Sequence, residues 1–334
     1  MALASPTWLH GLAVPPFEAH RALRSGHMQT LVLPFFTVPP APPGERVAIP
    51  VRHGHLIGRL DRVASPRGVA IVIHGINGTA EEAFVLRTAA KLQRKGFDTL
   101  RLNLRGSGES MGAAAGMTHS GLTDDLRAVY DHLLTRYEHV ACVGFSLGGQ
   151  LLLRTVGEWG DAPPAGACAA VSISAPIDLV RCSAFVARRE TALYEWFLVT
   201  RLRRRYARLV AAMPPEFTRE RVRAVKTIRH FDDAVIAPLH GFRDADHYYE
   251  SSGASAVLPA VRVPTVIVHA ADDPLVPVAP VLDARATASS WVRFVVTERG
   301  GHVGFVAQRP AAGDDDRYWA ECRAADFVGA SVRG

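Results

Sequence analysis

Short, continuous hydrophobic runs recur along the chain, and most of them are followed by a segment in which apolar residues have helical spacing. Such runs are typical of strands that are buried on both faces of a parallel sheet. Their alternation with helical segments predicts an α/β fold with a mostly parallel central sheet and helices on both faces. The predicted strands lie at residues 68–73, 98–103, 139–145, 167–175, 264–270 and 291–296.

Two earlier segments, 47–51 and 56–63, are expected to form an antiparallel hairpin at one edge of the sheet. A proline-rich stretch at 37–44 precedes them and indicates an extended connector. Helices are expected between the strands. The best defined of them runs over 79–94, with Thr79 as its N-cap and two glutamates in its first turn, where the helix dipole favours acidic groups. The other predicted helices cover 122–137, the residues after 146, 281–287 and 315–328.

Residues 178–255 interrupt this alternation. They carry helical patterns with aromatic residues, and none of their runs resembles a buried parallel strand. We expect a single domain over residues 1–334, in which 178–255 form a cap inserted above the carboxyl edge of the sheet. That edge is where ligands bind in open α/β sheets.

The composition supports a large folded core, since 48% of the 334 residues are hydrophobic and 21% are charged. Lysine and arginine exceed aspartate and glutamate by six, but the excess is scattered apart from a cluster of arginines within 201–205. Diffuse positive charge without a recognition motif does not predict nucleic-acid binding. The cluster could hold a cap helix near anionic lipid headgroups, although solvated arginines are the commoner case and membrane association is not expected.

Four cysteines lie far apart in the sequence and are interpreted as reduced thiols of a cytosolic protein. They have no zinc-type spacing, so no metal site is predicted. Residues 1–17 lack the basic start and apolar stretch of a signal peptide, and no run approaches the roughly 20 apolar residues of a membrane span. These features favour a cytoplasmic location. The cysteines are Cys142, Cys168, Cys182 and Cys322.

The strongest chemical signal is a Gly-x-Ser-x-Gly motif at residues 144–148. It follows a predicted buried strand and opens a predicted helix, which is the context of a nucleophile elbow. Glycines on either side let strand and helix approach closely, and the helix N-terminus favours developing negative charge. Ser146 is therefore the candidate nucleophile.

A serine nucleophile needs a base and an acid that orients the base. In folds with such an elbow the chain order is serine, acid, histidine. His302 follows the last predicted strand in a glycine-rich loop and is the candidate base. Asp273 is the preferred acid, because the proline directly after it fixes the local backbone. Asp272 and Asp178 are the alternatives.

A tetrahedral intermediate needs backbone N–H groups that are already in place to stabilise its oxyanion. One should be the amide of Leu147, directly after the nucleophile. We assign the second to Ile76, in the loop after the strand at 68–73, with Asn77 as the alternative donor or as a plain turn residue.

Several further strings strengthen this interpretation, and with them the sequence resembles the α/β-hydrolase superfamily and, within it, the YheT-like serine hydrolases. The segment 23–30 is similar to an N-terminal His-x-Gln-Thr signature of that family, with Ser25 where asparagine is usual. Nearly the whole chain is covered by matching strings in the same order. The other strings lie at 74–78, 103–106, 119–121, 231–233, 237–242 and 248–249.

The resemblance implies one catalytic domain, no cofactor and hydrolysis of small-molecule carboxylic esters, with lipid or acyl esters as substrates of some relatives. It also implies that His74, Asn77 and His119 lie near the site. His119 can equally be an ordinary histidine in the first turn of a helix. The string at 231–233 is interpreted as structural, joining the cap to the core.

Two other functions compete with a serine esterase. The same triad could transfer the acyl group to an alcohol or thiol, or the fold could serve binding without catalysis. The second is disfavoured because candidates for all three triad residues are present. An aromatic cluster in the cap is expected to wall a pocket for short- to medium-chain acyl groups, or else to pack the cap onto the core. The sequence does not indicate an oligomeric state. The cluster comprises Phe185, Tyr194, Trp196, Phe197 and Leu198.

Overall fold

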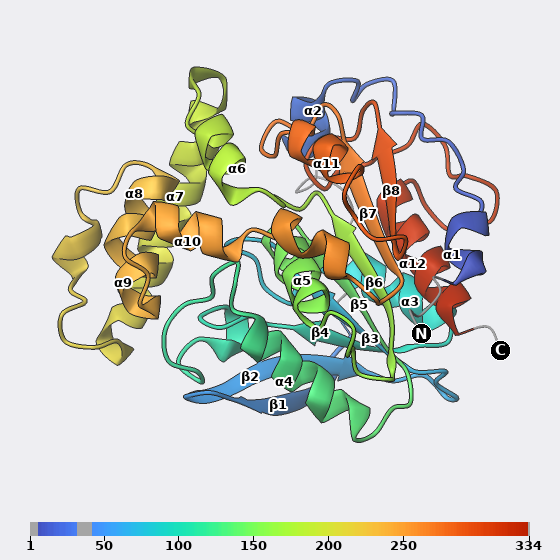
Figure 1. The fold of residues 1–334 in the computed structure, drawn as a ribbon, viewed down its shortest axis with the longest axis horizontal. Coiled ribbons are helices and arrows are strands. Elements are labelled where there is room, and N and C mark those ends of the chain that lie inside the picture. Colours follow the sequence, from blue (N-terminus) through green and yellow to red (C-terminus); the bar gives the residue numbers. More distant parts are fainter. Residues whose placement is uncertain (1–5, 32–41, 333–334) are drawn as a thin grey trace.

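Eight strands form one central sheet in the computed structural model, which describes residues 6–31 and 42–332 (Figure 1). Their order across the sheet is β1-β2-β4-β3-β5-β6-β7-β8. Most of the connector predicted at 37–44 lies outside the described residues. The strands are β1 (Glu45–Val51), β2 (Gly54–Asp61), β3 (Val69–Ile73), β4 (Asp98–Leu102), β5 (Val140–Phe145), β6 (Ala167–Ile173), β7 (Thr265–Ala270) and β8 (Val292–Thr297).

The strand directions follow the predicted pattern. β1 and β2 form the antiparallel edge hairpin, and β2 also runs antiparallel to β4. From β4 onward all neighbouring strands are parallel. Because parallel strands end at the same edge, the loops after β3, β5, β7 and β8 meet there. The predicted α/β fold with a mostly parallel sheet is confirmed.

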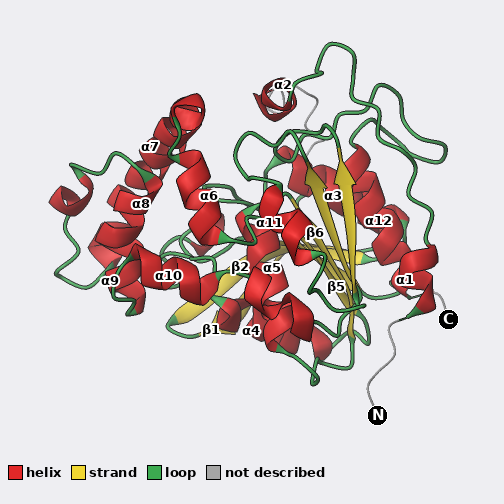
Figure 2. Ribbon diagram, turned by 45° about the horizontal axis from the view of Figure 1, so that its top comes forward, coloured by secondary structure: helices red, strands yellow, loops and turns green. Residues whose placement is uncertain are grey.

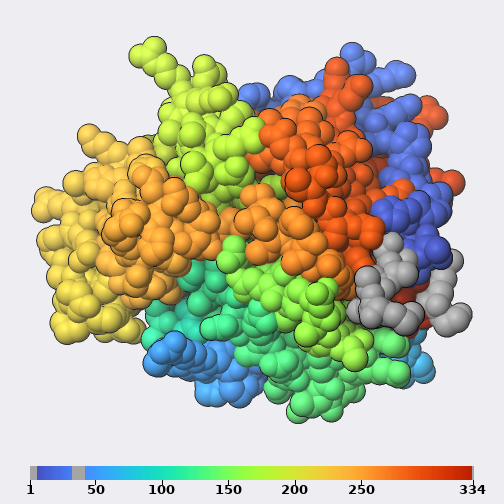
Figure 3. Space-filling view, in the orientation of Figure 1, coloured from blue at the N-terminus to red at the C-terminus, as the bar shows by residue number. Residues whose placement is uncertain are grey.

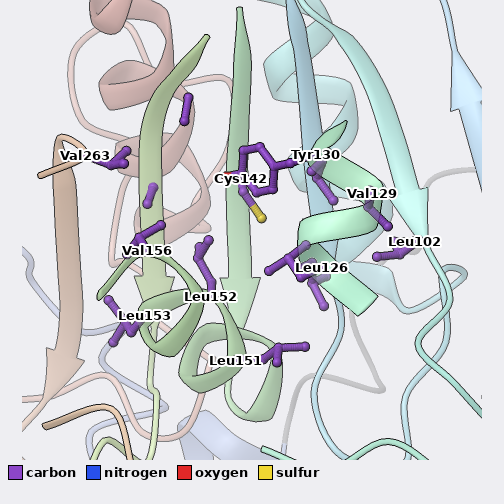
Figure 4. Packing of buried hydrophobic residues seen from close by; sticks show 14 of the residues in the cluster. Leu102, Leu126, Val129, Tyr130, Cys142, Leu151, Leu152, Leu153, Val156 and Val263 are labelled. Atoms are coloured by element: carbon purple, nitrogen blue, oxygen red, sulfur yellow. The ribbon is translucent and has the colours of Figure 1, made fainter. Parts of the chain in front are cut away.

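Helices cover both faces because successive side chains of each buried strand point to opposite sides. In β5, Cys142 packs toward α4 and α5, whereas Val143 belongs to the cluster on the other face. Figure 4 shows Cys142 and Tyr130 among the leucines and valines on the face of the sheet that α4 and α5 cover. One face carries α4 (Thr123–Leu134), α5 (Leu147–Glu158) and α11 (Ala279–Ala284), and the other carries α1 (Thr7–Gly11), α3 (Ala83–Arg94) and α12 (Trp319–Ser331).

The predicted start of the helix after β3 is wrong. α3 begins at Ala83, four residues later than expected, and Thr79 is not its N-cap. The Thr79 hydroxyl instead accepts a hydrogen bond from the Glu81 amide, and the Asn103 side chain accepts one from the Ala80 amide. These bonds close a turn that delays the helix, so Glu81 lies outside its first turn and pairs with Arg101.

The 178–255 insertion contains helices and helical turns but no strand, as the sequence predicts. It lies to one side of the sheet (Figures 1 and 2) and has an apolar cluster of its own. The seventh helix is the longest, and the eighth and ninth are joined by a π-helical turn, Asp232–Ile236. The helices are α6 (Leu179–Val186), α7 (Ala192–Leu209), α8 (Ile228–Phe231), α9 (Ala237–His240) and α10 (Ala245–Ser252).

The string at 231–233 has a different role from the one expected. Asp232 accepts a hydrogen bond from the Tyr249 hydroxyl at 2.6 Å, and Asp233 accepts one from the Ala245 amide at 2.7 Å. Both partners belong to α10, inside the insertion. The two carboxylates therefore connect two parts of the insertion rather than the insertion to the sheet.

Candidate active site

Ser146 lies between β5 and α5 with a backbone φ of 52°, in the region that non-glycine residues rarely adopt. Such a conformation costs of the order of 1–3 kcal/mol and persists only where the surroundings impose it. Here the close packing of strand and helix around the turn imposes the conformation of Ser146. A Cβ atom on Gly148 would lie 2.5 Å from the His74 carbonyl oxygen, and one on Gly144 would lie 2.4 Å from the Gly148 carbonyl oxygen. The sharp turn that results holds the serine at the carboxyl edge of the sheet.

His302 contacts both Ser146 and Asp273. Its Nε2 atom lies 3.0 Å from the Ser146 Oγ atom, and its Nδ1 atom lies 2.9 Å from an Asp273 carboxylate oxygen. Because a carboxylate only accepts, the proton of neutral His302 is on Nδ1, which leaves Nε2 to accept from the serine hydroxyl. The three side chains thus form a continuous hydrogen-bonded relay.

Asp273 is fully buried, and the second oxygen of its carboxylate accepts hydrogen bonds from the backbone amides of Leu275 and Val276 at 2.8 and 2.9 Å. Burial alone would raise the pKa of Asp273. The attraction of Asp273 to the protonated form of His302 and the hydrogen bonds from His302 and Leu275 outweigh that effect and hold the pKa of Asp273 below its usual value. Asp273 is therefore ionised at neutral pH and can stabilise an imidazolium.

The two alternative acids have other partners. Asp272 accepts a hydrogen bond from the Gly301 amide at 2.9 Å, which supports the loop that carries the histidine. Asp178 caps α6 by accepting from the Arg181 amide. Of the three aspartates considered from the sequence, Asp273 is the one that contacts His302.

The loop that carries His302 is held by the N-terminal segment through α2 (Gly26–Leu31). The Thr30 hydroxyl accepts a hydrogen bond from the His302 amide at 2.8 Å. The side chain of Gln29 is completely buried, donates to the Leu23 and Val306 carbonyls and accepts from the Val306 amide. The sequence analysis assigned no role to Gln29 or Thr30. Both belong to the His-x-Gln-Thr string, which is the sequence signal that could have indicated their support of the histidine loop.

The loop after β3 approaches the nucleophile closely, since a Cβ atom on Gly75 would lie 3.1 Å from the Ser146 Cβ atom. Ile76 and Leu147 line the same cavity as Ser146. Asn77 lines this cavity too, and its side-chain amide donates a hydrogen bond to the Leu198 carbonyl of α7 at 3.1 Å.

Two arginines of the predicted 201–205 cluster also reach this loop. Arg201 donates to the Asn77 carbonyl at 3.1 Å, and Arg205 donates to the Gly78 carbonyl at 3.1 Å and to the Ser107 hydroxyl at 2.8 Å. Together with the Asn77 side chain they join α7 of the insertion to the segment directly after Ile76. The arginine cluster therefore does not form a single solvated face.

His74 lies behind the loop rather than in the cavity. Its Nε2 atom accepts from the Leu104 amide at 3.2 Å, so Nδ1 carries the proton and donates to the Gly75 carbonyl at 2.7 Å. Burial lowers the pKa of His74 to about 4, which keeps the ring neutral at physiological pH. This histidine connects the loops after β3 and β4.

His119 lines the cavity, and contacts with Gly121 and His240 fix the position of its ring. Its Nδ1 atom accepts from the Gly121 amide, and its ring lies 4.3 Å from that of His240. Burial, followed by the charges of His240 and Arg105, lowers its pKa to about 2. A neutral His119 can act as a hydrogen-bond donor through Nε2 and not as a cation.

The cavity above Ser146 has a volume of about 320 Å³, within the range of small-molecule sites, which is roughly 300–1,000 Å³. Both the sheet loops and the insertion line it, and most of its wall is apolar. The lining residues from the insertion include Leu179, Val186, Leu198, Leu202, Ile228 and Phe231.

The predicted aromatic wall is wrong for four of its five members. Leu198 lines the cavity, but the side chains of Trp196 and Phe197 are 62% and 50% exposed. The reason is the rotation of α7, whose buried stripe consists of Glu195, Val199, Leu202, Tyr206 and Leu209. Tyr194 is turned toward His27, and the Phe185 ring is covered by the guanidinium of Arg188.

A family model described as the alpha/beta hydrolase fold matches residues 69–307, which include all the strands from β3 to β8 and the three relay residues. The chain belongs to the α/β-hydrolase family. "Putative esterase YheT" of Escherichia coli (strain K12) is 30% identical to this α/β-hydrolase over 262 residues, covering 77% of this chain and 75% of that protein.

The monoacylglycerol lipase of Saccharomyces cerevisiae (strain ATCC 204508 / S288c) is 27% identical over 267 residues, or 76% of this chain and 58% of the lipase. This chain therefore spans less than two thirds of that relative. The esterase Pf2001 of Pyrococcus furiosus shares the fold with a TM-score of 0.59 and 18% identity, over 86% of this chain and 91% of that chain.

These similarities confirm the predicted YheT-like membership and, in general form, the prediction of an ester hydrolase. Within the described ranges we find no helix whose length and hydrophobicity would let it cross a membrane.

Proposed function

We propose that this α/β-hydrolase is a serine hydrolase that cleaves carboxylic esters through an acyl-enzyme. The observation that carries the proposal is the position of His302, with Nε2 3.0 Å from the Ser146 hydroxyl and Nδ1 2.9 Å from Asp273. In the reaction the Ser146 oxygen bonds to the ester carbonyl carbon while its proton moves to His302 Nε2. The buried carboxylate of Asp273 stabilises the imidazolium that results.

The backbone amides of Leu147 and Ile76 are proposed to donate to the oxyanion of the tetrahedral intermediate. When the intermediate collapses, the bond to the alcohol oxygen breaks and His302 gives its proton to that oxygen. Water then attacks the acyl-enzyme, with His302 taking the water proton and returning it to Ser146. The products are one carboxylic acid and one alcohol, and Ser146 is restored.

We propose further that the insertion acts as a cap over Ser146 and that its apolar wall takes the acyl chain. Leu179, Leu202 and Phe231 contribute to that wall from three parts of the insertion. Each methylene group that is buried gains about 0.8 kcal/mol. KM should therefore fall as the acyl chain lengthens, until the cavity of about 320 Å³ is full.

A series of p-nitrophenyl esters from acetate to decanoate tests this proposal. We expect hydrolysis that depends on Ser146 and a KM that decreases over short to medium chains. Adding an alcohol acceptor and separating the products distinguishes hydrolysis from acyl transfer. Free acid as the dominant product supports the esterase, whereas quantitative transfer to the alcohol would make the protein an acyltransferase.

A further inference from the structure

The large hydrophobic side chains that stand exposed in the described part of the chain lie on four helices: α2, α6, α7 and α11. Polar contacts join these helices in two pairs, α2 with α7 and α6 with α11. The His27 ring of α2 lies 3.0 Å from the Tyr194 hydroxyl of α7, and Arg181 of α6 pairs with Asp283 of α11 at 2.7 Å. Figure 1 shows α2, α6 and α11 along the same end of the molecule, and in Figure 3 the yellow-green part of the insertion projects from it. The exposed residues, which we call the apolar rim, are Met28, Leu31, Val180, Leu193, Trp196, Phe197 and Leu282.

The outer face of α7 is regular. Leu193, Trp196 and Phe197 have the i, i+3, i+4 spacing of one helical face, and their side chains are 70%, 62% and 50% exposed. The same face continues one and two turns later with Arg201 and Arg204, both exposed. One side of this helix is thus packed into the insertion, while the other presents aromatic and aliphatic groups followed by cations.

The charge around the rim is unbalanced. Arg188 and Arg189 are exposed just before α7, and Arg201 and Arg204 are exposed in its second half. Among residues 6–31 and 42–332, no carboxylate lies within ion-pair distance of these four guanidinium groups. Glu190 is the exposed carboxylate of this stretch, since Glu195 is buried and accepts from the Ile228 amide. The rim therefore combines apolar side chains with unpaired positive charge.

Helices that carry the apolar rim also line the cavity. Thr30 of α2 and Leu198 and Arg201 of α7 line the cavity that contains Ser146, and each lies next to or one turn from an exposed rim residue. The apolar rim and the cavity wall therefore share helices α2 and α7.

We infer that the apolar rim docks onto an anionic lipid surface. Trp196 and Phe197 would enter the boundary between headgroups and acyl chains, which suits aromatic side chains, and Arg188, Arg189 and Arg204 would face lipid phosphates. The mixture of large apolar groups and unpaired cations favours this partner over a second copy of the chain, whose own rim would present the same positive charge. Docking itself needs no catalysis, but the delivery of an ester into the cavity rests on the proposed function.

The test measures binding of the full chain to vesicles of phosphatidylcholine alone and of phosphatidylcholine with 30% phosphatidylglycerol, by co-sedimentation. We expect binding to the anionic vesicles to be at least about tenfold tighter, and to weaken as NaCl rises from 50 to 500 mM, because screening shortens the range of the attraction. The double variant Trp196→Ala/Phe197→Ala should lose about tenfold in affinity.

A matched pair of charge variants separates a specific surface from general basicity. Arg188→Gln/Arg189→Gln should weaken binding to anionic vesicles several-fold. Arg52→Gln/Arg136→Gln, which removes two exposed arginines from the hairpin and the end of α4, should leave it unchanged. Equal losses in the two pairs, or no loss in Trp196→Ala/Phe197→Ala, would overturn the proposal.

Two further readouts identify the cause of a failure. A concentration-dependent dimer that Trp196→Ala/Phe197→Ala dissociates would make the rim a self-association surface and contradict lipid docking. Hydrolysis of soluble p-nitrophenyl acetate by this variant should stay within about twofold of wild type. If wild type binds vesicles but does not cleave this ester, the proposed function fails while the docking inference stands.

Discussion

The hydroxyl of Thr30 accepts a hydrogen bond from the backbone amide of His302 at 2.8 Å, across a sequence separation of 272 residues. It also donates to the Gly26 carbonyl at 2.7 Å, so its orientation is fixed from both sides. We propose that the N-terminal segment positions the catalytic base through this contact, without itself touching the substrate.

Thr30→Val keeps the shape of the side chain and removes the acceptor. One neutral hydrogen bond is worth about 1 kcal/mol, so we expect kcat to fall roughly 5- to 10-fold with little change in KM. Thr30→Ser restores the hydroxyl and should recover most of the activity. A Thr30→Val enzyme with unchanged kcat would show that the histidine loop is held adequately without this bond.

Asp273 should be the acid that orients His302. Asp273→Asn preserves size but favours the wrong imidazole tautomer, and in triads of this kind the change lowers kcat by about 10⁴-fold. Asp272→Asn alters the carboxylate that accepts from the Gly301 amide and should cost far less. Steady-state kinetics on both variants decide the assignment, which is reversed if Asp272→Asn is the more damaging change.

The contact between α7 and the loop after β3 predicts a role for Arg205. This side chain donates to the Gly78 carbonyl two residues after Ile76, so Arg205→Ala should loosen the loop that holds the proposed oxyanion donor. We expect kcat to fall roughly tenfold, and binding of a trifluoromethyl ketone transition-state mimic to weaken in parallel. Arg204→Ala, an exposed neighbour on the same helix, provides the control. Parallel losses in both variants would point to a general effect of charge.

Two buried histidines, His74 and His119, and the half-buried His240 predict that the stability of the fold decreases in mild acid. Burial lowers the pKa of His74 and His240 to about 4 and that of His119 to about 2. Below the usual value of about 6.5, the unfolded chain binds protons at these sites and the folded chain does not. His74 and His240 therefore contribute stability that is complete above pH 6.5 and declines toward pH 4, and the contribution of His119 declines toward pH 2. Each of the three contributions is smaller by about 2 kcal/mol at pH 5.

Urea unfolding at pH 7.5 and pH 5 measures this effect. His240→Gln removes one titrating group, so its loss of stability between the two pH values should be smaller than that of wild type by about 2 kcal/mol. His230→Gln changes an exposed histidine and should behave as wild type does. An identical pH dependence in all three proteins would mean that His240 is protonated in the folded state.

Local sequence patterns were sufficient to predict the positions of the strands and the residues of the hydrogen-bonded relay, and the reason is the same for both. The central parallel strands are short, largely apolar runs, and Ser146, Asp273 and His302 each come directly after or a few residues past the end of a strand that hydrophobicity predicts. Parallel topology then brings them to one edge. The contact of Thr30 with His302 could not be predicted in this way, because it joins distant segments through a single hydroxyl.

The orientation of α7 was not predictable for a different reason. Both of its faces carry large apolar residues, so periodicity alone does not show which face is buried. Packing of Val199, Leu202 and Tyr206 into the insertion decides it and leaves Trp196 outside. The early start predicted for α3 failed because the Thr79 hydroxyl closes a turn instead of capping the helix.

The central claim is that Ser146 is the nucleophile, and covalent labelling tests it most directly. A fluorophosphonate probe should modify the wild-type protein, with the label mapped by mass spectrometry to the peptide that contains Ser146. Ser146→Ala should remain folded, escape labelling and lose nearly all ester hydrolysis, since removing a triad nucleophile costs about 10⁶-fold in kcat. Ser183→Ala, which changes another serine of the same cavity, should still be labelled. Labelling or hydrolysis that persists in Ser146→Ala would contradict the account.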